Sequence, residues 1–216
     1  MANTIIHLLR HGEVHNPDKV IYGRLPGFRL SERGQQMAQI VADWLVAGGH
    51  EIDAVIASPL QRAQETAAPA ALAYGVPVGA DERLIEADSV FENSCVGAKP
   101  LGLLAPRWWP KLYDPFRPSW GEPYREQADR VLAAVADARA AHLGGEVLLV
   151  SHQLPIWVTR LALEGKRLWH SPLKRQCSTA SITSLRYTDE TLTSITYAEP
   201  AGDLAKSLSK DSWSPR

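Results

Sequence analysis

Two arginines, two histidines and a carboxylate stand out in this sequence because each belongs to a short polar motif beside an apolar run. In chain order the motifs are Leu9-Arg10-His11-Gly12-Glu13, Ser58-Pro59-Leu60-Gln61-Arg62, Leu84-Ile85-Glu86 and Ser151-His152. Guanidinium forks suit a phosphate dianion. A neutral imidazole is a nucleophile, and a carboxyl group can protonate a leaving oxygen. These residue types together predict a site that transfers a phosphoryl group.

Each residue of this set has a candidate role in such a transfer. His11, neutral at working pH, would attack the phosphorus atom, and Gly12 would let the backbone come close to the bound group. A cationic His152 would balance charge on the phosphoryl oxygens, since positioning and charge compensation carry this kind of catalysis. Glu86 would protonate the leaving oxygen, provided that burial and the nearby dianion raise its pKa, and would then activate water.

Alternating strands and helices must position these motifs. Apolar runs predict strands at 4–9, 52–57, 76–78 and 146–150; helical spacing predicts helices from the N-cap Ser31 to Gly48 and at 63–73, 122–142 and 155–163. Segments 180–187 and 191–198 predict a β-hairpin. Such alternation indicates a mostly parallel sheet covered on both faces, with ligands bound beyond the carboxyl ends of its strands. We therefore expect the first, second and fourth motifs at one rim of the sheet.

The segment at about 88–121 breaks this alternation. It is rich in proline and holds six aromatic residues, namely Phe91, Trp108, Trp109, Tyr113, Phe116 and Trp120. A long stretch without regular structure is usually functional or a lid; the alternative is a packed irregular subdomain without ligand contact. We expect one domain over residues 1–199 that includes this cap insertion, followed by a flexible C-terminal tail over 200–216.

Composition excludes several classes of protein. The chain has 216 residues, of which 45% are hydrophobic and 22% charged, so it is neither mainly disordered nor fibrous. Its net charge of −1 gives no support for nucleic-acid binding. No apolar run approaches the roughly 18 residues of a spanning helix, and the N-terminus lacks the features of a signal peptide. These features predict a cytoplasmic protein without membrane contact, in which Cys95 and Cys177 are free thiols.

The motifs resemble those of the histidine phosphatase superfamily, in its phosphoglycerate-mutase-like branch (branch 1). The run Arg10-His11-Gly12-Glu13 matches the signature of that family, and segments 58–67 and 27–38 match two further elements, so the resemblance covers residues 4–187. It implies a three-layer α/β/α sandwich with a cap insertion. It also implies that His11 is phosphorylated, that Glu86 donates the proton, and that the phosphate pocket is built by Arg10, Arg62 and His152.

The resemblance implies weaker assignments for three loop residues. Asn16 lies near the asparagine with which the family contacts phosphate, although its spacing from the first motif is one residue short of the commonest mutase pattern. Gly23 and Arg24 fall where the family's loop contacts substrate. No cofactor is implied.

The residues after Glu86 distinguish two reactions. Glycolytic mutases of the family carry an arginine and a tyrosine directly after the acid, whereas this chain has Ala87-Asp88-Ser89-Val90. The departure favours a phosphatase of the histidine acid type that hydrolyses a phosphomonoester; the Trp-Glu-Gly pattern of many such phosphatases is also absent. A phosphoglycerate mutase is the alternative, and a weakly catalytic module that binds phosphorylated ligands is a second one. The expected partner is a small, anionic phosphorylated metabolite, and a homodimer stays open.

The spacing of the histidines predicts no metal site. His11 and His15 have the i, i+4 spacing of a zinc-binding helix, but their segment leaves a strand and enters a loop with Pro17, so it cannot present both on one helical face. His7 is expected to be a sheet residue and His50 a surface residue.

Overall fold

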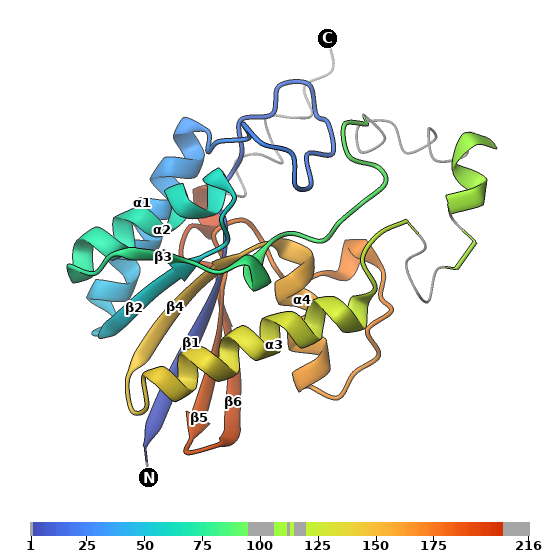
Figure 1. Ribbon diagram of the computed structural model, residues 1–216. Helices are drawn as coiled ribbons and strands as arrows, with labels where there is room; N and C mark the ends of the chain where they lie inside the picture. The colour runs from blue at the N-terminus through green and yellow to red at the C-terminus, as the bar shows by residue number, and fades with distance from the viewer. Residues whose placement is uncertain (1, 95–105, 112, 115–119, 205–216) are drawn as a thin grey trace.

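The computed structural model describes residues 2–94, 106–111, 113–114 and 120–204. Its centre is a six-stranded sheet with the order β3-β2-β4-β1-β5-β6 (Figure 1). The strands are β1 (Asn3–Arg10), β2 (Ile52–Ala57), β3 (Val78–Ala80), β4 (Glu146–Ser151), β5 (Ile182–Thr188) and β6 (Thr191–Ala198). β1 to β4 run parallel, and β5 and β6 form an antiparallel hairpin that pairs with β1. The mostly parallel sheet and the hairpin are confirmed.

Helices cover both faces of the sheet. They are α1 (Glu32–Ala47), α2 (Gln61–Tyr74), α3 (Tyr124–Ala141) and α4 (Gln153–Leu163), with short 3₁₀ helices η1 (Glu82–Leu84), η4 (Pro106–Lys111) and η5 (Pro172–Lys174). Leu9 and Leu148 pack with α1 and α2, whereas their strand neighbours Leu8 and Val147 pack with α3 and α4. Successive strand residues point to opposite faces. The molecule is therefore a three-layer α/β/α sandwich, as expected.

Local chemistry sets the ends of the helices. Ser31 Oγ accepts a hydrogen bond from the Gly34 backbone N–H at 3.0 Å and caps α1. Gly75 ends α2 with φ of 67°, in the left-handed region that suits glycine. α4 begins at Gln153, before Pro155, because the N–H groups of a first turn have no helical acceptor and proline is tolerated there. β3 starts later than expected, since Pro77 cannot donate to the ladder.

The two ends of the cap insertion are tied to each other. An isolated bridge joins Ser89 to Gly121, and a Cβ on Gly121 would lie only 2.2 Å from Asp88 O, so this close approach requires glycine. Residues 95–105, 112 and 115–119 lie outside the described residues, and the expectation of a lid there stays a prediction. Ala201 of the expected tail is buried in the core, while residues 205–216 lie outside the described residues.

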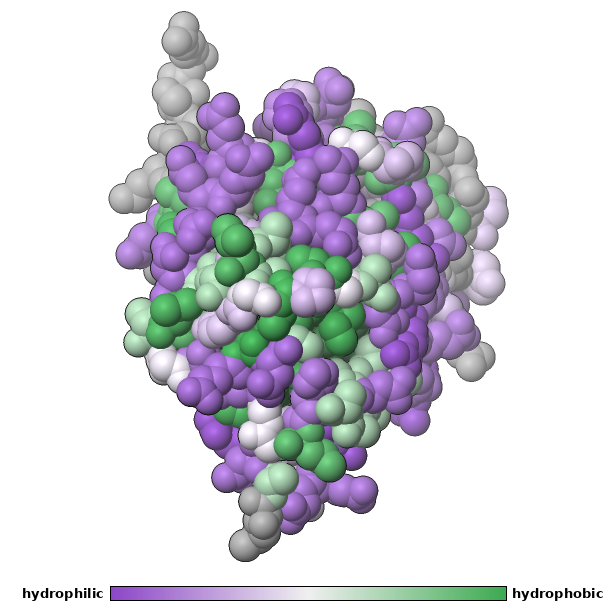
Figure 2. Space-filling model, turned by 60° about the vertical axis from the view of Figure 1, so that its left-hand side comes forward, coloured by the Kyte–Doolittle hydropathy of each residue, from purple (hydrophilic) through white to green (hydrophobic). Residues whose placement is uncertain are grey.

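The surface of the α1–α2 layer carries some apolar side chains. Figure 2 brings the left-hand side of Figure 1 forward and shows an apolar patch surrounded by polar residues. Exposed apolar residues of these helices include Val46 and Leu72. Within the described residues, no helix combines the length and the apolarity needed to cross a membrane.

Candidate active site

The carboxyl ends of β1, β2 and β4 bring the expected residues together. Arg10 pairs with Ser151 across β1 and β4, and the His11 backbone N–H donates to Ser151 O at 3.1 Å. His152 directly follows β4, and Arg62 lies in the first turn of α2, just after β2. The rings of His11 and His152 are 5.1 Å apart between centroids. The sheet therefore delivers both histidines and both arginines to one rim, as its topology predicts.

His11 is held in the tautomer that a nucleophile needs. Its side chain is 2% exposed, and Nδ1 lies 2.7 Å from Gly12 O. A carbonyl oxygen only accepts, so Nδ1 carries the proton and Nε2 keeps its lone pair. Burial, followed by the charges of Arg10 and Arg62, holds the pKa of His11 well below its usual value. The imidazole is therefore neutral at neutral pH and ready to attack.

Gly12 is required for packing against α1, whereas its expected close approach to a bound group stays a prediction. A Cβ at this position would lie 2.6 Å from Gly34 O, in the first turn of α1. A Cβ on Gly34 would in turn meet Glu13 O at 2.0 Å. The Gly12 N–H donates to Thr66 Oγ1 at 3.0 Å. The paired glycines thus let the loop after the nucleophile pack directly on α1 and fix its path.

Arg62 and His152 form a buried polar pair. Arg62 is 1% exposed; its Nη2 donates to Gly23 O at 2.6 Å and lies 3.3 Å from His152 Nδ1. Because a guanidinium only donates, His152 Nδ1 accepts, and Nε2 carries the proton toward Ser58 Oγ at 2.8 Å. Burial, then the charges of His11 and Arg62, lowers the pKa of His152 well below its usual value.

Burial and the positive charges around His152 work against the expected cationic ring. A phosphate dianion beside the ring would have the opposite effect, so the cationic form stays a prediction for the complex with phosphate.

The two arginines offer unused donors to an anion. Arg10 Nη1 donates to Cys177 O at 2.6 Å. Within the described residues, Arg10 Nε and Arg62 Nε are buried and have no hydrogen-bond partner. Buried unsatisfied donors are costly, and a phosphate oxygen is the strongest acceptor that could satisfy them. The cluster is thus built for an anion.

Glu86 has the environment of a proton donor. It lines the same cavity as His11, and its Oε1 accepts from the Ala87 N–H at 2.9 Å. Burial raises the pKa of Glu86, although that hydrogen bond and the charges of Arg62 and Arg10 oppose the rise. A carboxyl group with a raised pKa stays protonated over a wider pH range, which suits a general acid.

The three loop residues play different parts in the structure. Gly23 lines the cavity and supplies the carbonyl that holds Arg62. Arg24 instead supports the wall from behind: its Nε donates to Glu86 O at 2.7 Å and its Nη2 to Glu122 Oε2 at 3.0 Å. The amide of Asn16 makes both of its described hydrogen bonds with the Val20 backbone, at 2.8 and 3.1 Å, and Asn16 does not line the cavity.

The cavity over His11 has a volume of about 380 Å³. Its wall also contains residues that were not among the predicted site residues, namely Tyr22, Phe91, Trp120, Gln153 and Arg175. Of these, Phe91 and Trp120 belong to the aromatic set of the cap insertion. Arg62 Cζ lies 4.8 Å from the centroid of the Tyr22 ring, a cation–π contact that orients the guanidinium. Arg175 Nη1 donates to Gln153 Oε1 at 3.3 Å. The one available signal for Arg175 is the basic run between Arg160 and Arg175.

Comparison with known proteins places this geometry in a family. The model of the histidine phosphatase superfamily (branch 1) matches residues 6–200, nearly the whole chain. The chain belongs to this superfamily. The resemblance seen in the motifs is therefore confirmed.

Proteins with several different names are similar to this chain. "Uncharacterized protein Rv0525" of Mycobacterium tuberculosis is 52% identical over 198 residues, which cover 92% of this chain and 97% of that protein. "Probable phosphoglycerate mutase GpmB" of Salmonella paratyphi B is 30% identical, with 93% of each chain covered. The solved structure of mycobacterial glucosyl-3-phosphoglycerate phosphatase Rv2419c has a TM-score of 0.70 at 25% identity, covering 91% of this chain and 96% of that one. The choice between phosphatase and mutase therefore depends on this chain's own residues.

Proposed function

We propose that this histidine phosphatase hydrolyses a phosphomonoester through a phosphohistidine on His11. The observation that carries the proposal is the hydrogen bond from His11 Nδ1 to Gly12 O, because it leaves the Nε2 lone pair as the nucleophile. The donors of Arg10 and Arg62 then have an anion to bind, and Glu86 has a proton to give.

In the first step, His11 Nε2 attacks phosphorus and the bond from phosphorus to the ester oxygen breaks. The leaving oxygen takes the proton of Glu86 and departs as an alcohol, which leaves a Glu86 carboxylate. Arg10, Arg62 and His152 balance the charge on the phosphoryl oxygens; His152 takes a proton from solvent when the dianion binds, before the attack. The transition state needs little else than this positioning and charge compensation.

In the second step, water attacks the phosphohistidine. The Glu86 carboxylate removes a proton from the water as its oxygen bonds to phosphorus, and the bond from phosphorus to Nε2 breaks. Inorganic phosphate leaves, while His11 and protonated Glu86 are restored. Each group thus returns to its starting state, and the cycle needs no cofactor.

A phosphoglycerate mutase is the alternative, in which a second substrate hydroxyl replaces water. The residues after the acid favour hydrolysis: buried Ala87 stands where the mutases carry their arginine, and Ser89 stands where they carry their tyrosine. Arg175 on the cavity wall suits a substrate with a second anionic group, as expected for a small phosphorylated metabolite.

A panel of phosphorylated metabolites tests the reaction type. It includes glucosyl-3-phosphoglycerate, and 3-phosphoglycerate with and without 2,3-bisphosphoglycerate, because relatives are named for such compounds. Release of inorganic phosphate without bisphosphoglycerate supports a phosphatase, whereas isomerisation that requires bisphosphoglycerate supports the mutase.

The second alternative, a weakly catalytic module that binds phosphorylated ligands, is tested by labelling. Rapid mixing with an aryl phosphate should give a burst of product, with the phosphoryl label on His11. A folded protein that binds phosphate but shows neither label nor turnover would contradict the proposed reaction and support the binding module.

A further inference from the structure

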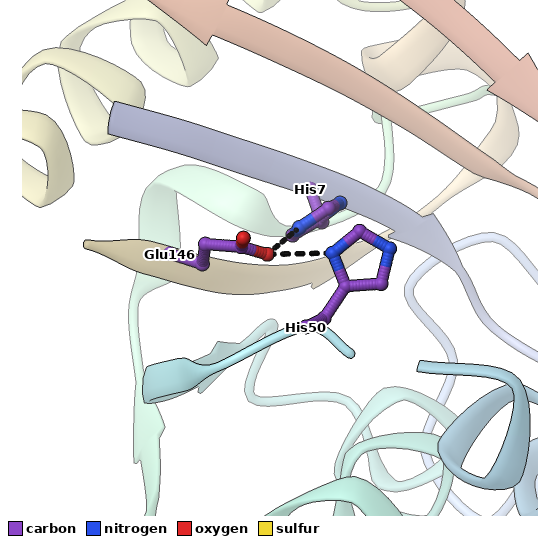
Figure 3. A group of neighbouring side chains, drawn as sticks. All are labelled: His7, His50 and Glu146. Atoms are coloured by element: carbon purple, nitrogen blue, oxygen red, sulfur yellow. Dashed lines mark hydrogen bonds and ion pairs between the residues drawn. The ribbon is translucent and has the colours of Figure 1, made fainter. Parts of the chain in front are cut away.

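A second polar cluster lies at the end of the sheet opposite to the catalytic cavity. It consists of His7 in β1, Glu146 at the start of β4, and His50 in the loop between α1 and β2 (Figure 3). His7 precedes His11 by four residues on an extended strand, so the cluster is about 13 Å from the nucleophile along β1. None of the three residues has a part in the proposed reaction.

The two rings point at one carboxylate oxygen. His7 Nε2 lies 2.9 Å and His50 Nδ1 2.7 Å from Glu146 Oε2, and Figure 3 shows that oxygen between the two rings. One candidate ligand atom from each residue lies within 4.8 Å of the others. The register of β1 and β4 holds the sheet partners in place, since Ile5 pairs with Glu146. The pairing of β1 with β4 therefore fixes the relative positions of His7 and Glu146, two of the three residues of the cluster.

We propose that His7, His50 and Glu146 bind a divalent zinc ion. Two imidazole nitrogens and one carboxylate oxygen form a ligand set that zinc accepts, with a fourth position for water. Harder cations such as Mg²⁺ prefer oxygen ligands and do not suit two imidazoles. This ion would tie the loop before β2 to the two central strands, so its effect is on stability rather than on catalysis.

The surroundings of His7 fit this proposal. Its side chain is 1% exposed, and its Nδ1 lies 2.8 Å from Ser184 Oγ on β5. In the empty cluster, Nε2–H donates to Glu146 and Nδ1 accepts from the serine hydroxyl. When zinc takes the Nε2 lone pair, the ring proton moves to Nδ1 and donates to the same Oγ. A hydroxyl serves both tautomers, which is how outer partners commonly support a ligating histidine.

The cluster needs only a small expansion to hold the ion. Tetrahedral zinc with ligand bonds of about 2.0–2.1 Å separates neighbouring ligand atoms by about 3.3 Å, so the two contacts to Glu146 Oε2 must lengthen by about 0.5 Å. His50 and Glu146 are 22% and 20% exposed, which leaves them free to move and lets the ion enter.

Zinc titration of the untagged full-length protein tests the site. We expect one tight ion per chain and a rise in Tm with zinc, because an ion that binds the folded state stabilises it. His50→Gln and Glu146→Gln should each weaken zinc binding by at least about 100-fold, without loss of phosphatase activity. Both positions are partly exposed, so we expect these variants to fold, and their Tm without zinc verifies folding.

Two control proteins separate this site from others. His15→Gln replaces an exposed histidine on a different loop and should bind zinc as the wild type does. His11→Ala removes the catalytic histidine and should also keep the tight ion, which excludes binding at the catalytic histidines. Two results would overturn the proposal. One is that the wild-type protein binds no zinc at a free zinc concentration about 100 times the Kd of a typical zinc site. The other is that the wild-type protein, His50→Gln and Glu146→Gln bind zinc equally tightly.

Discussion

Replacing Glu86 by glutamine gives the sharpest test of the proposed acid. Glutamine has the same size, and its carbonyl oxygen can still accept from the Ala87 N–H that now bonds Glu86 Oε1 at 2.9 Å. A general acid is uncharged when it acts, and burial, which raises the pKa of Glu86, favours that form. The substitution therefore leaves the charge of the acting state unchanged. The variant should therefore fold normally and lack only the transferable proton.

The size of the loss depends on the leaving group. An alkyl phosphate expels a strongly basic alkoxide, so losing the general acid should lower kcat/KM by about 10²–10⁴-fold, or about 3–5 kcal/mol. An aryl phosphate expels a weakly basic phenoxide, and its kcat/KM should fall by less than about 10-fold. The ratio kcat/KM is the informative quantity because it reports steps only up to release of the alcohol.

The second step should reveal the same residue as a base. Glu86→Gln cannot activate water, so an aryl phosphate should give a burst of one phenol per enzyme followed by slow turnover, with the phosphohistidine accumulating. Asp88→Asn, an exposed carboxylate on the same cavity wall, is the matched control and should change both substrates by no more than about twofold. Equal losses of kcat/KM on alkyl and aryl phosphates would refute the role of Glu86 as proton donor.

Four further outcomes are expected. His11→Ala should abolish turnover of an aryl phosphate with an unchanged Tm; activity near that of the wild type would exclude the mechanism. Arg62→Met should lower kcat/KM for an aryl phosphate by more than about 100-fold, because it removes a buried guanidinium that is placed to bind the phosphoryl group; a loss of less than about tenfold would contradict that role. With an alkyl phosphate, kcat/KM should fall at high pH because Glu86, whose pKa is raised, loses its proton. It should also fall at low pH because His11, whose pKa is lowered, gains a proton. Glu86→Gln should remove the fall at high pH. Incubation with EDTA should leave turnover intact, and a loss that zinc restores would overturn metal-independent catalysis.

The helices and strands whose hydrophobic residues recur at a regular spacing could be predicted from the sequence. Strand β2 has the expected bounds, and the strand ends place His11 and His152 together because parallel strands share one carboxyl rim. The reason for Gly12 could not be found in this way, since the contact that requires it is with Gly34, 22 residues further along.

The cavity wall and the second cluster depend on distant contacts. Trp120 and Arg175 lie in segments without periodicity, so nothing local shows which of their neighbours face the cavity. His50 was expected at the surface, but it is 22% exposed and bonds Glu146, which lies 96 residues away in the sequence. Only the register of two strands and the path of one loop bring such residues together.

The position of β1 has a consequence for how this protein can change. His11 follows a strand held on both sides, by β4 and by β5, whereas much of the rest of the cavity wall comes from the irregular segments around Ser89 and Gly121 and from Arg175. Under the proposed reaction, substitutions in that part of the wall can alter which ester is accepted while the phosphate-binding half stays fixed. Selection, or an engineer, can then redirect specificity at these positions without changing His11, Arg10, Arg62 or Glu86.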